Sequence, residues 1–588
     1  MKHIIIGAVA GGASAAARLR RLDEKAEIVI FERGEYMSYA NCGLPYYIGE
    51  VIRERNKLFV QNATSFKLRY NIDVRIRTEV LRIDRIRKTV FARNLEDGVE
   101  YEESYDKLLL SPGAAPIVPP FPGKDLDGIF SLRNVADTDK IKGYINQVIA
   151  KNKALSFGEN GGGNLNENGM RDEIGNENGV GGGVGVGKAV VVGGGFIGLE
   201  MAENLRHLGM KVSLVELGNQ VLAPLDFTMV SFVQQHLREK GVELWLQHSV
   251  TGFEKTTKGL NVMLKSGDKI EADVVVLSIG VKPDSHLAEE AGLQVGLGKA
   301  ITVNEFLQTS DPDIYAVGDA IEFKNPISGQ IMPTYLAGPA NKQGRIVANN
   351  MVMGNKEKYK GAINTAIVKV FDLTAGTTGL SAKALKKLGI PYLVSTTHSA
   401  SHATYYPESA QMSIQLTFSA EGKIYGAQIV GKDGVDKRLD VMAQIIQNEG
   451  GIEDLMEFEH AYAPPYSSAK DPVNMAGFVA ENILLKKLKV ITWDDLGEIQ
   501  PTDLLIDVRN PDEFASGTIP NAINIPVDEI RGRLNELPKE KNIYIFCQIG
   551  LRGYLAQRIL LQNGFEKVKN IGGGYKLWKS CQAEFVNL

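Results

Sequence analysis

Short apolar runs alternate with helix-like segments along the first half of the chain. The runs lie at residues 3–6, 27–32, 107–111, 188–192, 212–216 and 273–279. Brief, almost wholly apolar runs bounded by turn residues are typical of strands buried on both faces of a parallel sheet. The pattern therefore predicts an α/β fold with parallel sheets rather than an all-α or all-β chain.

The second half of the chain has a different texture. Residues 330–480 mix helical segments with strands expected near 363–371 and 412–430, which is typical of an α+β domain. A basic stretch at 486–489 is interpreted as a solvated linker, and a compact final unit begins near Val490. Because one core rarely serves more than about 200 residues, 588 residues predict three to five domains.

Residues 158–187 form a low-complexity segment with 12 glycines and 6 asparagines in 30 positions. Such a composition buries too little apolar surface to offset the entropy of ordering the chain. We therefore expect a mobile surface loop inserted just before the strand at 188–192. No chemistry is assigned to it, since long loop insertions are cheaply tolerated.

Composition and charge argue against several classes of function. An apolar fraction of 44%, a charged fraction of 23% and a net charge of -4 leave no basic footprint for nucleic acid. The first residues enter a strand directly, without the parts of a signal peptide, so we expect a cytoplasmic protein without a membrane partner. Three cysteines, Cys42, Cys547 and Cys581, are too few and too scattered for a disulfide framework or a metal cage.

A dinucleotide-binding fingerprint follows the run at 188–192. Gly193, Gly195 and Gly198 form a G-x-G-x-x-G turn between strand and helix, and Glu216 ends the next strand. The glycines let a pyrophosphate approach the helix N-terminus, while the carboxylate accepts hydrogen bonds from a ribose 2′-hydroxyl and repels a 2′-phosphate. With no Arg or Lys at 217–220, the sequence favours NADH over NADPH.

A second, weaker fingerprint stands at the N-terminus. Gly7 and Gly12 follow the run at 3–6, but Val9 occupies the position of the second glycine. Support comes from Glu32, which ends the next strand about 20 residues later, as a ribose-binding carboxylate should.

Two further stretches, at 109–114 and 309–320, make the pattern specific. With the two fingerprints they resemble the FAD-dependent pyridine nucleotide-disulfide oxidoreductases, in which an NAD domain is inserted between two halves of an FAD domain. The resemblance implies bound FAD, with Asp319 on its ribityl chain. The cofactor-binding residues it implies are Gly7, Gly11, Gly12, Glu32, Arg33, Asn41, Cys42, Val80, Ser111, Pro112, Gly113, Gly193, Gly195, Phe196, Ile197, Gly198, Glu200, Glu216, Gly280, Gly318, Asp319 and Ala337.

Most members of that family carry two neighbouring cysteines, but residues 41–45, Asn-Cys-Gly-Leu-Pro, contain one. A lone thiol that receives two electrons cycles through a mixed disulfide with an external sulfur or through a sulfenic acid. The motif resembles the single-cysteine branch that contains coenzyme A disulfide reductases, NADH oxidases and NADH peroxidases. Cys42 is therefore the expected redox centre, and a buried structural cysteine is the alternative.

The rest of the pocket decides between sulfur and oxygen substrates. Similarity to the coenzyme A disulfide reductases implies that coenzyme A, as substrate or bound group, contacts Ser14, Arg18, Arg21, Ser38, Asn41, Lys67, Arg69 and Lys470, whose cations suit phosphates. It also implies that Tyr405 and Tyr462 reach across a homodimer interface to the sulfur near Cys42. From composition alone, the cations could equally form a solvated helix face, and the tyrosines could be half-buried interface aromatics.

Three blocks, at 503–514, 517–526 and 543–553, resemble a single-domain rhodanese. A strand delivers Cys547 to a loop that turns into a helix, so backbone N–H groups and the helix dipole converge on the sulfur and favour an anion. The spacing from Cys547 to Arg552 makes a tighter loop than the C-x5-R of cysteine phosphatases, which favours a compact sulfane sulfur over a phosphate. Cys581 has no motif around it and is expected to be structural or incidental.

The resemblance covers the whole chain except 158–187 and matches fusions of coenzyme A disulfide reductase with rhodanese, some of which reduce persulfide or polysulfide. It implies FAD-binding parts at 1–112 and 253–330, an NAD-binding domain at 113–252, a dimerisation domain at 331–485 and a rhodanese domain at 490–588. The expected reaction is NAD(P)H- and FAD-dependent reduction of coenzyme A disulfide, coenzyme A persulfide or polysulfide at Cys42, while Cys547 handles sulfane sulfur. Two alternatives stay open: an NADH oxidase or peroxidase cycling Cys42 through sulfenate, and a sulfurtransferase with a regulatory flavin half.

Overall fold

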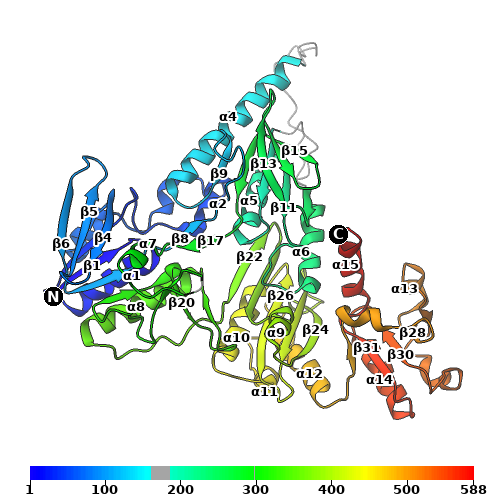
Figure 1. The fold of residues 1–588 in the computed structure, drawn as a ribbon. Helices are drawn as coiled ribbons and strands as arrows, with labels where there is room; N and C mark the ends of the chain where they lie inside the picture. Colours follow the sequence, from blue (N-terminus) through cyan, green and yellow to red (C-terminus); the bar gives the residue numbers. More distant parts are fainter. Residues whose placement is uncertain (160–185, 297, 588) are drawn as a thin grey trace. The chain divides into compact units, whose positions relative to one another are not determined.

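The computed structural model describes residues 1–159, 186–296 and 298–587, so most of the expected insertion at 158–187 lies outside the described residues. The chain divides into two compact units (Figure 1). Unit 1 comprises Met1–Gly218 and Gly241–Ala362, and unit 2 comprises Asn219–Lys240 and Ile363–Leu588. None of the helices in the described part is long and apolar enough to cross a membrane.

The first sheet of unit 1 is parallel, with the strand order β19-β7-β1-β2-β3. Its strands are β1 (Lys2–Ile6), β2 (Glu27–Phe31), β3 (Asp73–Arg75), β7 (Lys107–Leu110) and β19 (Ile314–Ala316). Helix α1 (Ala10–Leu22) packs on β1 and β2, and α8 (Ala337–Met353) packs on α1. Strand β19 joins β7 only after the chain has built the second sheet, so the chain leaves this first sheet and returns to it.

The second sheet of unit 1 is also parallel, with the order β12-β11-β10-β16-β9. Its strands are β9 (Ile129–Ser131), β10 (Lys188–Val192), β11 (Lys211–Glu216), β12 (Val242–Leu246) and β16 (Val274–Leu277). Helix α5 (Phe196–His207) follows β10, and the long helix α4 (Val135–Glu159) follows β9.

Strand β16 pairs with both β10 and β9, so this second sheet extends past residue 252, the expected end of the NAD-binding domain. The antiparallel strands β13 (Val250–Lys255), β14 (Leu260–Leu264) and β15 (Lys269–Ala272) precede β16, and their apolar side chains share a core with those of β10. An apolar run shows that a strand is buried but not which sheet it joins. The return to the first domain begins at β17 (Val281–Pro283), which pairs with β8 (Ala114–Pro116).

Smaller elements complete unit 1. Two three-stranded sheets contain β4 (Thr78–Asp84), β5 (Thr89–Asn94) and β6 (Glu100–Ser104), and β18 (Ile301–Thr302), β20 (Ile321–Lys324) and β21 (Ile331–Pro333). The short helices are η1 (Asn41–Gly43), α2 (Leu44–Ile48), η2 (Arg55–Leu58), α3 (Ala63–Tyr70), α7 (His286–Glu290) and η3 (Gly318–Ala320).

Unit 2 begins with an antiparallel sheet of the order β22-β23-β26-β25-β24. The strands are β22 (Ala366–Val370), β23 (Leu373–Gly379), β24 (Leu393–Ala400), β25 (Gln411–Phe418) and β26 (Ile424–Gly431). The helices are α9 (Ala382–Leu388), α10 (Val435–Gln447), α11 (Ile452–Glu457) and α12 (Pro472–Leu484), of which α10 packs on β23 and β26. This α+β domain confirms the texture that the sequence predicted.

The C-terminal sheet of unit 2 is parallel, with the order β27-β31-β30-β28-β29. It contains β27 (Val490–Ile491), β28 (Leu504–Asp507), β29 (Ile523–Asn524), β30 (Ile543–Phe546) and β31 (Val568–Ile571). The accompanying helices are η4 (Trp493–Glu498), α13 (Pro511–Ala515), η5 (Ile530–Gly532), η6 (Leu534–Glu536), α14 (Leu551–Gln562) and α15 (Gly574–Val586).

Helix α6 (Phe227–Glu239) lies between β11 and β12 in the sequence but belongs to unit 2, where it contacts β23, β26 and α15. The buried carboxylate of Asp226, just before α6, explains this. It accepts hydrogen bonds from the backbone N–H groups of Ala382 (2.9 Å) and Lys383 (3.0 Å) and from the amides of Gln415 (2.7 Å) and Gln428 (2.6 Å). Four donors on one carboxylate fix the start of α6 to the antiparallel sheet.

Candidate active site

The two glycine turns of unit 1 are built alike. Gly7 follows β1 with φ +97°, and a Cβ there would lie 2.1 Å from the carbonyl oxygen of Ser111. Gly193 follows β10 with φ +107°, and its Cβ would lie 2.3 Å from the carbonyl oxygen of Ser278. Only glycine fits either position, because the left-handed backbone and the close neighbouring strand both exclude a side chain.

The last glycine of each turn brings the helix against the strand. A Cβ on Gly12 would lie 1.9 Å from the Gly7 oxygen, and one on Gly198 would lie 1.9 Å from the Gly193 oxygen. The middle position is different: a Cβ on Gly195 would meet only open space, and Val9 has an ordinary φ of -101°. Val9 therefore replaces the second glycine without entering the left-handed backbone region that would require one.

Each turn also holds a carboxylate at the end of the neighbouring strand. Glu32 accepts from the N–H groups of Ala8 (2.9 Å) and Gly34 (2.8 Å). Glu216 accepts from the N–H groups of Gly194 (2.7 Å) and Gly218 (2.7 Å). Two cradles, each with a close-packed glycine turn and a fixed carboxylate, fit two dinucleotides.

The remaining residues of the first cradle come from distant parts of the chain. Gly11 lies in the first turn of α1, where a Cβ would meet Val317 at 2.8 Å. Asp319 lies in η3, and burial raises the pKa of its carboxyl, while the Arg133 charge acts in the opposite direction. The other predicted positions are Arg33, whose guanidinium pairs with Asp284 (3.1 Å), Asn41 in η1, Val80 buried in β4, Pro112 and Gly113 after β7, Gly280 before β17, Gly318 in η3, and Ala337 at the start of α8.

Cys42 lies in the short turn η1 at the entrance to α2, and its side chain is exposed. Desolvation raises the pKa of the thiol, and the carboxylates of Glu200 and Asp319 raise it further. The protein groups around Cys42 therefore do not by themselves supply the electropositive setting that a thiolate requires. The neighbouring Asn41 contributes a buried side-chain oxygen that has no hydrogen-bond partner among the described residues.

Glu200 links the second dinucleotide cradle to Cys42. It lies on α5, as do Phe196 and the exposed Ile197, and its Oε1 accepts a hydrogen bond from the Tyr46 hydroxyl (3.2 Å). Burial raises the pKa of Glu200 to about 7, although the hydrogen bond from Tyr46 acts in the opposite direction. Glu200 therefore changes its charge near neutral pH, within electrostatic range of the thiol.

Replacing Glu200 with glutamine is expected to make Cys42 more reactive above pH 7. In the wild type Glu200 is ionised there and raises the pKa of the thiol, whereas below about pH 6 it is neutral and the two proteins should agree. Alkylation of Cys42 in the anaerobic, NADH-reduced holoenzyme, followed by mass spectrometry, should be at least about threefold faster at pH 8 in the variant. The same acceleration in Glu254→Gln, an exposed carboxylate of β13, or none in Glu200→Gln, would contradict this electrostatic coupling.

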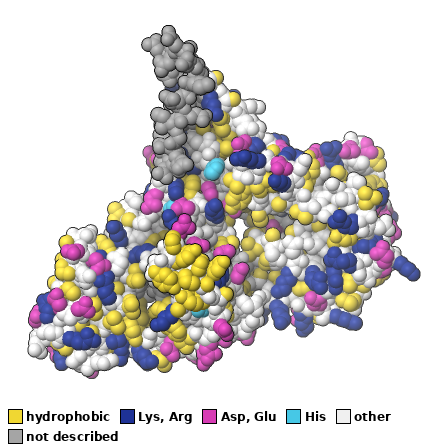
Figure 2. Space-filling view, turned by 180° about the vertical axis from the view of Figure 1, so that it is seen from behind, with side chains coloured by type: hydrophobic (Ala, Val, Ile, Leu, Met, Phe, Trp, Pro, Cys, Tyr) yellow, Lys and Arg dark blue, Asp and Glu magenta, His cyan; other side chains and the backbone are white. Residues whose placement is uncertain are grey.

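A cavity of about 380 Å³ opens beside α1 and α8 in unit 1. It is lined by Ala13, Ser14, Ala17, Arg18, Arg21, Ser38, Val60, Gln61, Phe66, Tyr70, Asn341 and Arg345. Figure 2 shows Lys and Arg side chains gathered on this part of unit 1. The cavity brings together four of the residues predicted to hold coenzyme A, and its three arginines suit an anionic ligand.

Hydrogen bonds to α8 hold two of the side chains that line this cavity. The Ser14 hydroxyl donates to Asn341 Oδ1 (2.5 Å), and Arg18 Nε donates to Asn349 Oδ1 (2.9 Å). Lys67 and Arg69, also predicted for coenzyme A, are exposed on α3 and are not among the residues that line the cavity, although Phe66 and Tyr70 of the same helix are.

Tyr405 and Tyr462 lie together in unit 2. Their hydroxyl groups are 3.3 Å apart, both side chains are exposed, and the hydrogen bond between them raises the pKa of Tyr405. Lys470 is exposed in the segment that also carries Tyr462. The structure thus joins two hydroxyl groups that are 57 positions apart in the sequence.

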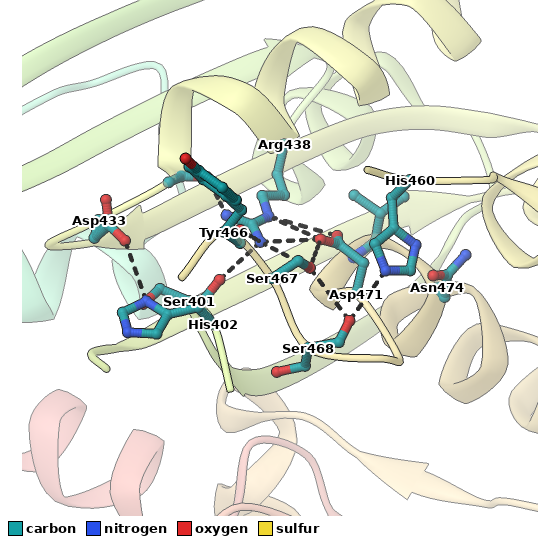
Figure 3. A network of polar contacts seen from close by, with 12 residues as sticks. Ser401, His402, Asp433, Arg438, His460, Tyr466, Ser467, Ser468, Asp471 and Asn474 are labelled. Atoms are coloured by element: carbon teal, nitrogen blue, oxygen red, sulfur yellow. Dashed lines mark hydrogen bonds and ion pairs between the residues drawn. The ribbon is translucent and has the colours of Figure 1, made fainter. Parts of the chain in front are cut away.

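A buried ion pair fastens the two segments that carry these tyrosines (Figure 3). Arg438 of α10 donates to Asp471 Oδ2 (2.9 Å) and to the carbonyl oxygen of Ser401 (2.8 Å). The Ser467 hydroxyl donates to the same carboxylate (2.6 Å). Burial alone would raise the pKa of Asp471, but the hydrogen bonds from Arg438 and Ser467 hold it below its ordinary value. Both tyrosine segments therefore rest on one buried charge pair.

In the C-terminal domain, β30 ends at Phe546 and delivers Cys547 to a tight loop before α14. The side chain of Cys547 is buried, and the Gly550 N–H donates to its Sγ (3.1 Å). Gly550 has φ +111°, a conformation that turns its N–H toward the sulfur at the start of the helix. This geometry fits a sulfur anion.

Arg552, at the end of this loop, interacts with both Glu513 and Cys547. Both arms of its guanidinium bind the carboxylate of Glu513 on α13 (2.6 and 2.7 Å), which lowers the pKa of Glu513 to about 2. Cys547 in turn contributes to raising the pKa of Arg552, so the guanidinium lies within reach of the sulfur. Cys581 lies elsewhere, on α15, buried beside the Ser231 hydroxyl.

Sequence reasoning missed several residues of these sites. Asn341 and Arg345 lie on α8, more than 300 positions from α1, and reach the cavity only because α8 packs on α1. Tyr46 and Arg438 act through partners that are distant in the sequence. Glu513 lies in the rhodanese-like block at 503–514, but its partner Arg552 is 39 positions away.

Comparisons with known proteins agree with this geometry. The family "Pyridine nucleotide-disulphide oxidoreductase" matches residues 1–341, its dimerisation domain matches 365–472, and a "Rhodanese-like domain" matches 492–581. The chain therefore belongs to the pyridine nucleotide-disulphide oxidoreductases, and membership implies binding of FAD and NAD(P)H.

Similar proteins with names indicate which type of pyridine nucleotide-disulphide oxidoreductase this chain resembles. The chain is 34% identical over 483 residues to a coenzyme A disulfide reductase of Staphylococcus haemolyticus, covering 82% of this chain and 100% of that protein. It is 33% identical over 490 residues to a Methanocaldococcus jannaschii protein named NADH oxidase, covering 83% and 99%.

Two solved structures cover nearly the whole chain. Reduced Bacillus anthracis CoADR-RHD is 47% identical with a TM-score of 0.91, covering 99% of this chain and 98% of that one. An NAD-dependent persulfide reductase from A. fulgidus is 36% identical with a TM-score of 0.86, covering 98% and 100%. The chain is a flavin-dependent NAD(P)H oxidoreductase with a rhodanese domain, of the coenzyme A disulfide reductase and persulfide reductase type, which confirms the family predicted from its motifs.

Proposed function

We propose that this enzyme reduces coenzyme A disulfide or coenzyme A persulfide at Cys42, using NADH, and that its rhodanese domain handles the sulfane sulfur. The observation that carries the proposal is the arginine-lined cavity of unit 1. Ser38 lines this cavity and precedes Cys42 by only four positions. A cationic cavity lined by the segment that leads to a single thiol suits a substrate that carries both phosphates and a sulfur–sulfur bond.

The chemistry at Cys42 needs one attack and one reduction. The Cys42 thiolate attacks the coenzyme A sulfur of the persulfide, the sulfur–sulfur bond breaks, and hydrosulfide leaves. The resulting mixed disulfide takes up two electrons and one proton, which returns the Cys42 thiolate and free coenzyme A thiol. FAD, when bound, supplies that electron pair from the nicotinamide. With coenzyme A disulfide the first leaving group is a thiolate instead.

The chain's own residues would support these steps in different ways. Arg18, Arg21 and Arg345 would bind the phosphates, with Ser14 and Ser38 beside them. Glu200 would hold or release a proton close to Cys42 around neutral pH. We infer that Tyr405 and Tyr462, from the partner subunit of a homodimer, donate hydrogen bonds to the reacting sulfur.

Two features favour NADH and a sulfur relay. Glu216 is held by two N–H groups in the position of a ribose-binding carboxylate, where it would repel the 2′-phosphate of NADPH. Cys547 has an anion-stabilising loop, so it would accept the outer sulfur from a donor as a persulfide and pass it to coenzyme A.

We place the domain borders after β16 for the NAD domain and before β27 for the rhodanese domain.

The test compares substrates under anaerobic conditions. Purified holoenzyme should oxidise NADH with coenzyme A disulfide and coenzyme A persulfide. Glutathione disulfide, which lacks the phosphates, should be a poor substrate. Arg21→Gln combined with Arg345→Gln should raise KM for coenzyme A disulfide about 10- to 100-fold, because each charge-assisted contact to phosphate contributes roughly a factor of ten. The control is Arg93→Gln, an exposed arginine of β5 paired with Glu100, which should leave KM unchanged.

The remaining outcomes separate the alternatives. Turnover with hydrogen peroxide or oxygen, but not with disulfide or persulfide, would favour the oxidase or peroxidase; the M. jannaschii relative is named NADH oxidase. Sulfur transfer that is lost in Cys547→Ser, with no disulfide or persulfide turnover at Cys42, would favour a sulfurtransferase with a regulatory flavin half.

A further inference from the structure

The backbone of the Cys547 loop rests on the start of α15. The Tyr575 N–H donates to the carbonyl oxygen of Cys547 (2.8 Å), and the Lys576 N–H donates to that of Gln548 (3.0 Å). A Cβ on Gly574 would lie 2.5 Å from the Cys547 oxygen, so the two segments are in close contact. The position of the Cys547 sulfur therefore depends on the turn at 572–574.

That turn cannot fix its own conformation. Gly573 and Gly574 have φ values of +73° and +61°, and consecutive glycines move easily between left- and right-handed regions. Something outside the turn has to select the observed arrangement. A buried carbonyl oxygen in the turn needs a donor, because leaving it unpaired is unfavourable.

The Leu577 N–H of α15 donates to the Gly573 oxygen only at 3.4 Å, and His398 of the dimerisation domain supplies the shorter hydrogen bond. His398 lies on β24, buried, with Nε2 3.0 Å from the Gly573 oxygen and Nδ1 2.8 Å from the Ser413 hydroxyl. A carbonyl oxygen only accepts, so Nε2 carries the proton and Nδ1 accepts from Ser413. Burial lowers the pKa of His398 to about 3, which keeps the ring neutral in this tautomer at neutral pH.

Other contacts within unit 2 join α15 or His398 to the antiparallel sheet and to α6. The Lys576 ammonium donates to Gln411 Oε1 (2.5 Å), and the Phe232 ring of α6 lies edge-on to His398, with ring centroids 6.2 Å apart. Further along α15, the Ser580 hydroxyl donates to Ser231 (2.9 Å), and Gln234 donates to the buried Glu584 (2.9 Å). Helix α15 is thus held at Lys576, Ser580 and Glu584 by partners outside the rhodanese domain.

We propose that His398 is a positioning residue for the rhodanese site: through the Gly573 carbonyl, the dimerisation domain holds the turn that supports the Cys547 loop. Sulfur transfer at Cys547 then depends on a side chain outside the rhodanese domain. The inference rests on the proposed rhodanese function and deepens it, because it makes the dimerisation domain part of the sulfur-transfer apparatus.

Two substitutions separate the two hydrogen bonds of the ring. His398→Gln places an amide N–H near the position of Nε2 and should keep the contact with Gly573. The shorter side chain of His398→Asn reaches only as far as Nδ1. It should keep the hydrogen bond with the Ser413 hydroxyl but lose the one to the Gly573 carbonyl oxygen. Thr397→Val, a buried neighbour on the opposite face of β24, is the control for the sheet itself.

The activity measured is sulfur transfer from thiosulfate to cyanide by the full-length holoenzyme. The Cys547 thiolate attacks the outer sulfur of thiosulfate and sulfite leaves, then cyanide removes the sulfur as thiocyanate and restores the thiolate. We expect kcat to fall about tenfold in His398→Asn and less than about twofold in His398→Gln and Thr397→Val, because displacement of a reacting atom is costly. Reduction of coenzyme A disulfide at Cys42 should stay within about twofold in all three.

A second readout does not require turnover. Hydrogen exchange at the Tyr575 and Lys576 amides should speed up in His398→Asn alone, and the alkylation rate of Cys547 should change with it. Equal exchange, alkylation and kcat in His398→Asn and the wild type would overturn the inference. A wild type that transfers no sulfur would instead contradict the rhodanese part of the proposed function. Should His398→Asn not fold, Ser413→Ala takes its place and should lower kcat for sulfur transfer. An unchanged kcat in Ser413→Ala would likewise overturn the inference about His398.

Discussion

Replacing Cys42 with serine is expected to lower NADH-dependent reduction of coenzyme A disulfide by at least about a thousandfold. A serine hydroxyl cannot form a mixed disulfide, so the step that captures the substrate sulfur is lost while both dinucleotide cradles stay intact. The assay is stopped-flow and steady-state NADH oxidation under anaerobic conditions. The variant should remain yellow, because neither Glu32 nor the glycine turns are altered.

The other two cysteines provide matched controls. Cys581→Ser should have wild-type turnover, because the Cys581 thiol is buried on α15 beside the Ser231 hydroxyl and takes no part in the proposed chemistry. Cys547→Ser should still reduce coenzyme A disulfide but lose sulfur transfer from thiosulfate. Wild-type reduction of coenzyme A disulfide by Cys42→Ser would show that another group does the chemistry, and the proposed role of Cys42 would be wrong.

Replacing Arg438 with methionine is expected to destabilise the dimerisation domain by about 3–5 kcal/mol. Methionine fills much of the same volume, but it leaves the Asp471 carboxylate buried without its cation and takes a donor from the Ser401 carbonyl. Since roughly 1 kcal/mol corresponds to about 2–4 °C in domains of this size, the melting temperature of this unit should fall by about 6–20 °C. Differential scanning calorimetry of the full-length holoenzyme measures this.

A second substitution tests whether the unpaired charge is the cause. Arg438→Met combined with Asp471→Asn removes both charges, and asparagine can still cap α12 by accepting from the Val473 N–H. The double variant should therefore melt above Arg438→Met alone. Arg533→Met, which breaks exposed ion pairs with Glu529 and Glu536, should change stability by less than about 1 kcal/mol. Equal melting temperatures for Arg438→Met and the wild type would show that the buried pair is dispensable.

Loss of the Arg438–Asp471 pair should also affect the two tyrosines proposed to act at the reacting sulfur. Tyr405 and Tyr462 are exposed, and their segments are joined through Arg438, Ser401 and Asp471 rather than by an apolar core around the rings. Loss of the pair should therefore loosen both segments before it unfolds the sheet. Faster hydrogen exchange at 401–407 and 460–470 at temperatures below the melting transition would reveal this order of events.

The sequence alone determined the elements whose signals are local. A strand followed by a glycine turn and a carboxylate about 20 residues later defines a dinucleotide cradle by steric necessity, because Gly7 and Gly193 tolerate no Cβ beside Ser111 and Ser278. The loop from Cys547 to Arg552 is equally compact in sequence, and so was readable in the same way. The α/β fold of the first half followed from short apolar runs, and the C-terminal α/β domain followed from the resemblance to a rhodanese.

Only the tertiary structure decided the pairings between distant segments. It assigned β16 to the second sheet, brought Arg345 of α8 to a cavity shared with Arg21 of α1, and fixed α6 to the antiparallel sheet through Asp226. It also joined His398 to Gly573, which are 175 positions apart. The physical reason is that burial and charge pairing depend on which surfaces meet. A local pattern reports that a side chain will be buried, but its partner is chosen by the packing of the whole unit.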